Sequence, residues 1–272
     1  MRTRVAVIGG GQSCEHDVSL ASAASVVGAL DPATYDVVPL TIDRDGTWRD
    51  RGLRPIGLCG AAQVLRGCDV AFPMVHGPRG EDGALAALCE LAGIAYVGSR
   101  VRPGAIAMDK WATKLVAGAV GIATAPGHLV TSATAAHQRW THQVVVKPVA
   151  AGSSLGVTLV TEANALQPAL KAAHDVLDHD AKYGGQADLR VPARVDEVDA
   201  KALEDAALAA YDALGCAGVA RVDFFLTEQG PVLNEVNTVP GMTEHSQVPR
   251  MFAAAGMSYP ELLDELVRGA RR

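Results

Sequence analysis

Short apolar runs alternate with stretches of helical spacing over the first third of the chain. Residues 5–8 form a continuous apolar run typical of a buried strand, glycines at 9–11 follow as a turn, and residues 19–27 carry a helical pattern. The same alternation predicts strands over 35–42 and 69–75 and a helix over 84–92. Strands that alternate with helices indicate a parallel sheet, and ligands of such sheets bind beyond the carboxyl ends of the strands.

Two polar loops fall at these strand ends. The glycine turn leads through Glu15 into the first helix, and a loop over 76–83 begins with His76 and precedes the next helix. A strand, a glycine turn and a helix start together present backbone N–H groups that can hold an anion, although a plain connecting turn has the same pattern. Glu15 either stabilises the first helical turn or holds a substrate ammonium group.

A second unit begins near residue 99. Asp109 opens a helix that runs to about residue 119, and an apolar strand over 143–148 places Lys147 at its end. A loop rich in glycine and serine follows over 149–156 and leads into a further short strand. A lysine before a loop of small residues suits a polyphosphate. The order of residues is not that of the P-loop, so a mobile hairpin is the alternative interpretation.

The last third predicts a hairpin flanked by helices. Helical spacing covers 162–177 and again about 198–214, and two short helical pieces are expected within 249–272. Between them, strands are expected over 219–226 and 232–237, joined by a cluster of turn residues.

Acidic and amide side chains replace apolar ones on this hairpin. Side chains alternate along a strand, so Arg221 and Asp223 share one face of the first strand, while Leu233, Glu235 and Asn237 share one face of the second. If the strands pair in the matching register, the oxygens converge beside the guanidinium. Such oxygens suit a hard cation such as Mg²⁺, which also keeps phosphate oxygens as ligands. By spacing alone, a solvated hairpin face explains the same residues equally well.

Composition narrows the class of protein. The chain has 272 residues, of which 49% are hydrophobic, so it can form two or three compact units. A net charge of -6 and an aromatic content of 4% argue against a nucleic-acid partner and favour small molecules. The five scattered cysteines fit neither a disulfide framework nor a zinc site. No apolar run has the length of a signal peptide or a membrane span, so a cytoplasmic location is expected.

Seven short motifs follow one another from end to end of the chain. They are Glu15-His16-Asp17-Val18-Ser19, His76-Gly77-x-x-Gly80-Glu81-Asp82-Gly83, Met108-Asp109-Lys110, Lys147-Pro148 with Gly152-Ser153-Ser154-x-Gly156, Asp180-Ala181-Lys182-Tyr183, Arg221-Val222-Asp223 and Glu235-x-Asn237-Thr238-x-Pro240-Gly241-Met242-Thr243-x-His245-Ser246. In this order they resemble the motifs of the D-alanine:D-alanine ligases of the ATP-grasp superfamily. Seven motifs in sequence are far more specific than any one of them.

The resemblance implies a fold, a reaction and an assembly. The fold is α/β with three ATP-grasp units: an N-terminal parallel sheet with flanking helices in 1–98, a truncated central unit in 99–177, and a catalytic, metal-binding unit with a mixed sheet in 178–272. ATP would phosphorylate the carboxylate of one D-alanine, and the amine of a second would attack the acyl phosphate to give the dipeptide used in peptidoglycan. A homodimer is also expected.

Roles for individual residues follow from the same resemblance. Glu15 would hold the ammonium of the first D-alanine, in a triad with Ser153 and Tyr183. The phosphates of ATP would contact Lys110, Lys147, Lys182 and Ser154. Only six lysines occur in the chain, and three of them fall at these positions.

The remaining roles concern the reacting carboxylate, the metal and the second substrate. Arg221 and the backbone N–H of Gly241 would stabilise an oxyanion. Two Mg²⁺ ions, for which Mn²⁺ could substitute, would be held by three residues of the hairpin: Asp223, Glu235 and Asn237. Ser246 would bind the carboxylate of the second substrate, with His76 and Gln247 also beside the substrates. Tyr183 favours a dipeptide over an ester product.

One departure from the family pattern is large. Family members carry a further run of a few tens of residues before the segment that begins at Asp178, including the hinge that reads adenine. Smaller departures are Ala151, where an acidic residue is usual, and Gln247, where an apolar residue is usual. Two alternatives therefore accompany the ligase hypothesis: a ligase of the same chemistry that acts on another amino acid, and a non-catalytic relative that binds a ligand or a partner.

Overall fold

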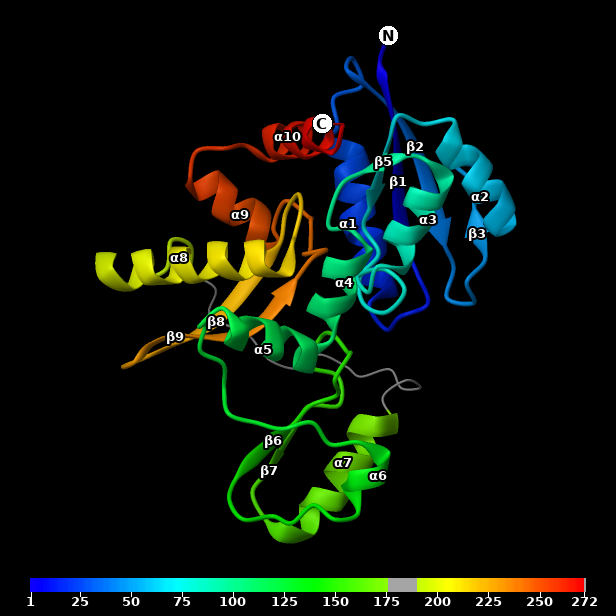
Figure 1. The fold of residues 1–272 in the computed structure, drawn as a ribbon. Helices are drawn as coiled ribbons and strands as arrows, with labels where there is room; N and C mark the ends of the chain where they lie inside the picture. Colours follow the sequence, from blue (N-terminus) through cyan, green and yellow to red (C-terminus); the bar gives the residue numbers. More distant parts are fainter. Residues whose placement is uncertain (176–189, 272) are drawn as a thin grey trace.

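The N-terminal unit is a five-stranded sheet. The computed structural model describes residues 1–175 and 190–271, and the sheet has the strand order β3-β2-β1-β4-β5 (Figure 1). All neighbours pair in parallel except β2 and β3. The strands are β1 (Thr3–Gly10), β2 (Tyr35–Ile42), β3 (Trp48–Arg49), β4 (Val70–Pro73) and β5 (Ala95–Tyr96). The predicted parallel sheet is therefore confirmed.

Helices cover both faces of this sheet, because alternate residues of β1 point to opposite sides. Val5 and Val7 pack in one core cluster with residues of α1 and α10, and Ala6 and Ile8 pack in a second with residues of α2 and α3. The helices are α1 (His16–Ala29), α2 (Gly57–Arg66), α3 (Ala84–Ala92) and α10 (Tyr259–Ala270). The last helix of the chain thus returns to the N-terminal sheet, and the two termini lie near each other (Figure 1).

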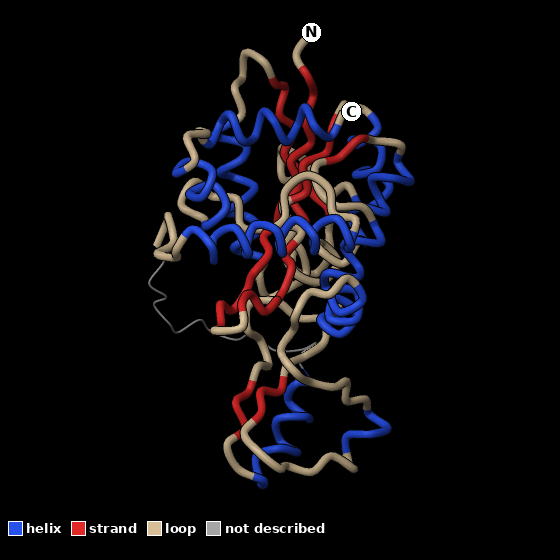
Figure 2. Tube along the Cα trace, turned by 60° about the vertical axis from the view of Figure 1, so that its left-hand side comes forward, coloured by secondary structure: helices blue, strands red, loops and turns tan. Residues whose placement is uncertain are grey.

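A small lobe is set apart from the rest of the molecule (Figures 1 and 2). It contains the antiparallel pair of β6 (Val144–Val146) and β7 (Thr158–Val160), and the helices α6 (Ser132–Ala135) and α7 (Leu166–His174), with a short 3-10 turn, η1 (Ala163–Ala165), before α7. Its own core joins Val160 to Leu166 and Ala169. The other face of the pair is exposed: Val145 and Leu159 are 52% and 56% accessible.

The third part of the chain lies between the sheet and the small lobe. It contains α4 (Val101–Met108), α5 (Lys110–Ala119), α8 (Glu197–Leu214), β8 (Arg221–Thr227), β9 (Gly230–Asn237) and α9 (Gln247–Ala254). Asp109 starts α5 by accepting hydrogen bonds from the backbone N–H groups of Trp111 and Ala112. Strands β8 and β9 form an antiparallel pair, and Thr124 adds a single parallel bridge to Leu233.

A β-bulge shapes the β8–β9 hairpin. Asp223 pairs with Glu235, whereas the next residue, Phe224, pairs with Leu233, so Asn234 is the extra residue of β9. The predicted matching register is confirmed around the acidic residues. The assignment of Leu233 to the face of Glu235 is wrong, because the bulge reverses the alternation there. Leu233 lies in the core together with Val236.

Most of the predicted helices and strands are present within three residues of their expected ends; α7 starts four residues later than predicted, and its predicted end at residue 177 lies outside the described residues. Helices α2, α4 and α6 and the short edge strands β3 and β5 were not predicted. In the part of the chain that the structure describes, no helix is both long and apolar enough to span a membrane.

Candidate active site

A cavity of about 420 Å³ opens where the three parts of the chain meet. Its walls include the ends of the glycine turn before α1, the loop after β4, the start of α5, the glycine and serine loop of the small lobe, and β9. Ten residues predicted from the sequence line it: Glu15, His76, Lys110, Lys147, Ser153, Ser154, Arg221, Glu235, Asn237 and Gly241.

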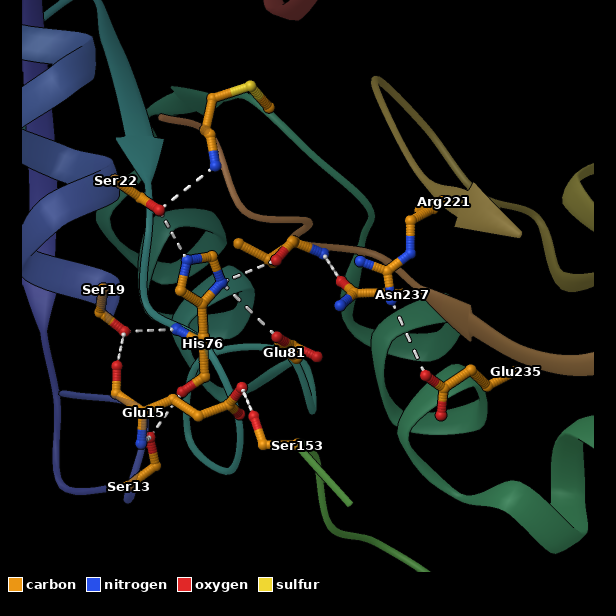
Figure 3. Close-up of polar contacts among 12 residues, drawn as sticks. Ser13, Glu15, Ser19, Ser22, His76, Glu81, Ser153, Arg221, Glu235 and Asn237 are labelled. Atoms are coloured by element: carbon orange, nitrogen blue, oxygen red, sulfur yellow. Dashed lines mark hydrogen bonds and ion pairs between the residues drawn. The ribbon is translucent and has the colours of Figure 1, made fainter. Parts of the chain in front are cut away.

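Glu15 lies on one side of this cavity and contacts a distant segment. The hydroxyl of Ser153 donates a hydrogen bond to its carboxylate (Figure 3). Burial raises the pKa of the Glu15 carboxyl above its ordinary value; the Ser153 hydroxyl opposes this shift, and the neighbouring Glu81 and Glu235 add to it. A half-buried carboxylate near other carboxylates is a site that a cation would stabilise.

The glycine and serine loop is bent to reach Glu15. Ser153 and Ser154 have positive φ angles of 53° and 55°, which cost energy for residues with a side chain. A Cβ at Gly152 would lie 2.6 Å from a carboxylate oxygen of Glu15, so any side chain there would force the Glu15 carboxylate to move. Backbone strain at this loop is typical of a functional segment.

Two lysines line the opposite part of the cavity. The ammonium of Lys110 donates to the carbonyl oxygen of Ala151 at 2.6 Å, and that of Lys147 donates to the side chain of Asn234 at 3.2 Å. Burial lowers the pKa of Lys110; Glu235 opposes the shift, and the positive charge of Lys147 adds to it. Two cations in one cavity repel each other and favour an anionic ligand between them.

The β8–β9 hairpin contributes a guanidinium between two carboxylates. Arg221 makes two hydrogen bonds from Nε and one from Nη2 to Asp223, at 2.8 to 3.0 Å. Its Nη2 lies 3.8 Å from the carboxylate of Glu235 (Figure 3). Asn237 accepts a hydrogen bond from the backbone N–H of Val239. Two carboxylates directly opposite each other in a strand pair repel, so this site requires a positive charge.

The remaining predicted residues lie beside the cavity or outside the described residues. Ser246 precedes α9, and its hydroxyl contacts the hydroxyl and backbone N–H of Thr243. Gln247 is the first residue of that helix, and Gly241 lies close by, since a Cβ there would be 3.2 Å from the Ser246 hydroxyl. Lys182 and Tyr183 lie outside the described residues.

Sequence reasoning missed two residues of the wall, Asn234 and Glu81. Asn234 was placed on the face away from Glu235, and only the bulge turns it toward Lys147. Glu81 belongs to the loop after β4 and lies 3.7 Å from the imidazole of His76. Its position in a polar loop at a strand end was the available signal.

Comparison with known proteins shows the family of the chain. Two family profiles match the chain: "D-ala D-ala ligase N-terminus" over residues 4–56 and 53–99, and "D-ala D-ala ligase C-terminus" over residues 170–268. The chain belongs to the D-alanine–D-alanine ligase family. A D-alanine–D-alanine ligase of Mycolicibacterium vanbaalenii is 36% identical, with 99% of this chain and 97% of the relative covered. The corresponding ligase of Mycobacterium avium is 35% identical, with 99% and 96% covered.

Solved structures of the family have the same fold. The VanG D-Ala:D-Ser ligase of Enterococcus faecalis superposes with a TM-score of 0.86 at 29% identity, covering 99% of this chain and 100% of that one. The D-alanine–D-alanine ligase of Coxiella burnetii gives 0.83 at 31% identity, with 99% and 95% covered. A ligase of Bacillus anthracis, solved in complex with ATP, gives 0.78 at 26% identity, with 98% and 97% covered.

The chain is shorter than these relatives. The alignment with the Mycolicibacterium ligase runs over 357 positions, whereas the chain has 272 residues, so at least 85 positions, the difference between the two lengths, face a gap in this chain. Because nearly the whole length of both proteins is covered, the missing positions are internal. The expectation of a shortened interior is confirmed, and its extent exceeds the few tens of residues that were expected.

Proposed function

We propose that the protein is an ATP-dependent ligase that joins two D-alanines through an acyl phosphate and so supplies the dipeptide of peptidoglycan precursors. One observation carries the proposal: residues from six separate segments line a single cavity and include a half-buried carboxylate, two lysines and an arginine. Members of this family bear the name of that reaction. Carboxylate activation by ATP needs these groups, because it brings an ammonium group and a polyphosphate into one site.

Each charged group of the cavity has a counterpart among the substrates. The Glu15 carboxylate, held by Ser153, would bind the ammonium of the first D-alanine, and burial makes that ion pair stronger than it would be in water. Lys110 and Lys147 would hold the ATP phosphates. Arg221 and the backbone N–H of Gly241 would stabilise negative charge on the reacting carboxylate, a contribution that is often the largest in catalysis.

The hairpin residues also fit a divalent cation. Within 1–175 and 190–271, no group of three or more His, Cys, Asp or Glu side chains could hold a metal ion. The set proposed here has two carboxylates and one amide: Asp223, Glu235 and Asn237. These hard oxygen donors suit Mg²⁺. The repulsion between Asp223 and Glu235, opposed by Arg221 in this structure, supports the same assignment. When bound, Mg²⁺ would neutralise charge on the ATP phosphates.

The identity of the second amino acid is a separate question. Ser246 and Gln247 at the start of α9 would contact its carboxylate, together with the positive end of the helix. One structural relative is a D-Ala:D-Ser ligase, so D-serine is the second candidate for this position. A homodimer is also part of the proposal, and sedimentation velocity tests it.

A phosphate-release assay tests the proposal. Purified protein with Mg²⁺ and millimolar ATP should release phosphate only when D-alanine is present, and mass spectrometry should detect the dipeptide. Asp223→Ala should abolish both signals. Release with D-alanine plus D-serine at a higher rate than with D-alanine alone would move the assignment to a mixed dipeptide. Absence of turnover with every D-amino acid, despite Mg-ATP binding by calorimetry, would contradict ligase activity.

A further inference from the structure

Three side chains, of which His76 also lines the cavity, hold the backbone around Gly241. The imidazole Nδ1 of His76 lies 2.8 Å from the carbonyl oxygen of Val239, and its Nε2 lies 3.0 Å from the hydroxyl of Ser22. That hydroxyl accepts a hydrogen bond from the backbone N–H of Met242 at 3.2 Å. Figure 3 shows this chain of contacts beside Glu15.

Both nitrogens of the imidazole are engaged. The Val239 carbonyl oxygen can only accept, so Nδ1 donates to it, and Nε2 contacts the Ser22 hydroxyl that holds the Met242 N–H. The side chain of His76 is only 4% exposed, so these contacts fix the orientation of the ring.

Tyr259, the first residue of the C-terminal helix, contacts the other backbone group of Met242. The hydroxyl of Tyr259, on α10, donates to the carbonyl oxygen of Met242, whose side chain is fully buried. Both backbone groups of Met242 are thus held, as is the carbonyl oxygen of Val239. Gly241 lies between the two held residues and lines the cavity.

We propose that Ser22, His76 and Tyr259 are positioning residues that aim the Gly241 N–H into the cavity. This inference rests on the proposed function, in which that N–H stabilises the oxyanion. Loss of one oxyanion donor costs about 100- to 1000-fold in kcat, and a displaced donor loses part of that. Ser22→Ala and Tyr259→Phe are therefore each expected to lower kcat about tenfold or more, with the KM for ATP changed less than about threefold.

Matched controls separate positioning from general stability. Ser99→Ala removes another buried hydroxyl that makes two backbone hydrogen bonds, both to Ala217. Tyr35→Phe removes a tyrosine hydroxyl from the same core cluster, where it contacts Asp264. Both controls should keep kcat within about twofold of wild type. His76→Asn, which can retain a donor toward Val239, should keep more activity than His76→Ala.

Amide hydrogen exchange gives a readout that does not depend on turnover. In Ser22→Ala, exchange at residues 241–242 should accelerate at least about tenfold, whereas Ser99→Ala should leave it unchanged. Unchanged exchange at 241–242 would overturn the proposal. So would equal losses of kcat in the variants and their controls. An inactive wild-type enzyme would instead defeat the proposed function, and the exchange data would still decide whether these side chains hold the loop.

Discussion

Glu15→Gln is the substitution whose outcome best separates a substrate-binding carboxylate from a structural one. The change removes a charge while it keeps the shape of the side chain and an oxygen that can accept from Ser153. If the Glu15 carboxylate mainly stabilises the fold, its substitution should make the protein less stable. If the carboxylate instead binds a substrate ammonium, the variant protein should be less active and more stable.

The pKa of Glu15 gives the direction of the stability change. Burial raises that pKa in the folded protein, and the folded state therefore binds the proton more tightly than the unfolded state. Stability is highest below the ordinary glutamate pKa of about 4.3 and falls as pH rises through the raised value. Glutamine carries no charge, so the variant does not lose stability as pH rises through this value. The variant should thus match wild type at low pH and exceed it above that window, where each 1 kcal/mol corresponds to roughly 2 to 4 °C in Tm.

Glu15→Gln should weaken substrate binding even though it raises stability. A hydrogen bond to a charged group contributes about 1.5 to 3 kcal/mol, so KM for the first D-alanine should rise about ten- to one-hundred-fold. Thermal unfolding from pH 4 to 8 and the phosphate-release assay measure the two effects. Glu90→Gln is the control: hydrogen bonds from Tyr96 and Arg100 lower the pKa of this surface carboxyl, so its loss should not raise Tm or change KM. A lower Tm for Glu15→Gln at pH 8, or an unchanged KM, would refute the reasoning.

Three further predictions concern the glycine and serine loop, the start of α10 and the choice between ATP and GTP. Gly152→Ala should lower kcat/KM at least about tenfold, because its Cβ would displace Glu15, while Gly28→Ala, with open space around it, should not; steady-state kinetics compares them. Ser258→Ala removes the capping box of α10 and should lower the free energy of unfolding by about 1 kcal/mol in urea titrations, and no change in midpoint would contradict this. The motifs predict that the internal gap includes the family's adenine-reading segment, so discrimination between ATP and GTP should be weak, with kcat/KM within about tenfold; a ratio above about 1000-fold would contradict this.

Much of the N-terminal sheet was predictable because local pattern and tertiary structure agree there. The apolar run at 5–8 is buried on both faces, as expected of a central parallel strand. Helix α2 escaped prediction because it is short and contains Gly57 and Gly60, which have low helix propensity, and only Ala61 and Leu65 of it are buried. Val198 belongs to the predicted apolar stripe of α8 yet is 78% exposed, so the stripe is buried only further along the helix, at Ala210 and Leu214.

The site was predictable in its residues and less so in its geometry. The motifs pointed to Glu15 and Ser153 as partners, and the structure places them in contact across 138 residues of sequence. The bulge at Asn234 could not be inferred, because a one-residue insertion in a strand leaves no mark in the alternation of short apolar and polar residues. The hydrogen bonds of Ser22 were equally hidden, since a serine inside a helix usually has no tertiary role.

The chain can lack these internal positions and still form the cavity, because the cavity residues lie on several different parts of the chain. Each two-stranded hairpin has an uncovered apolar side: Leu159 on β7 and Phe225 on β8 are 56% and 54% exposed. Isolated strand pairs are marginally stable, and longer relatives have residues available to cover them. Glu15 and Lys110 lie outside the hairpins, before α1 and at the start of α5. Lys147 and Arg221 lie at or on the hairpins and are held there by Asn234 and Asp223. The shortening should therefore affect the positions of Lys147 and Arg221 more than those of Glu15 and Lys110.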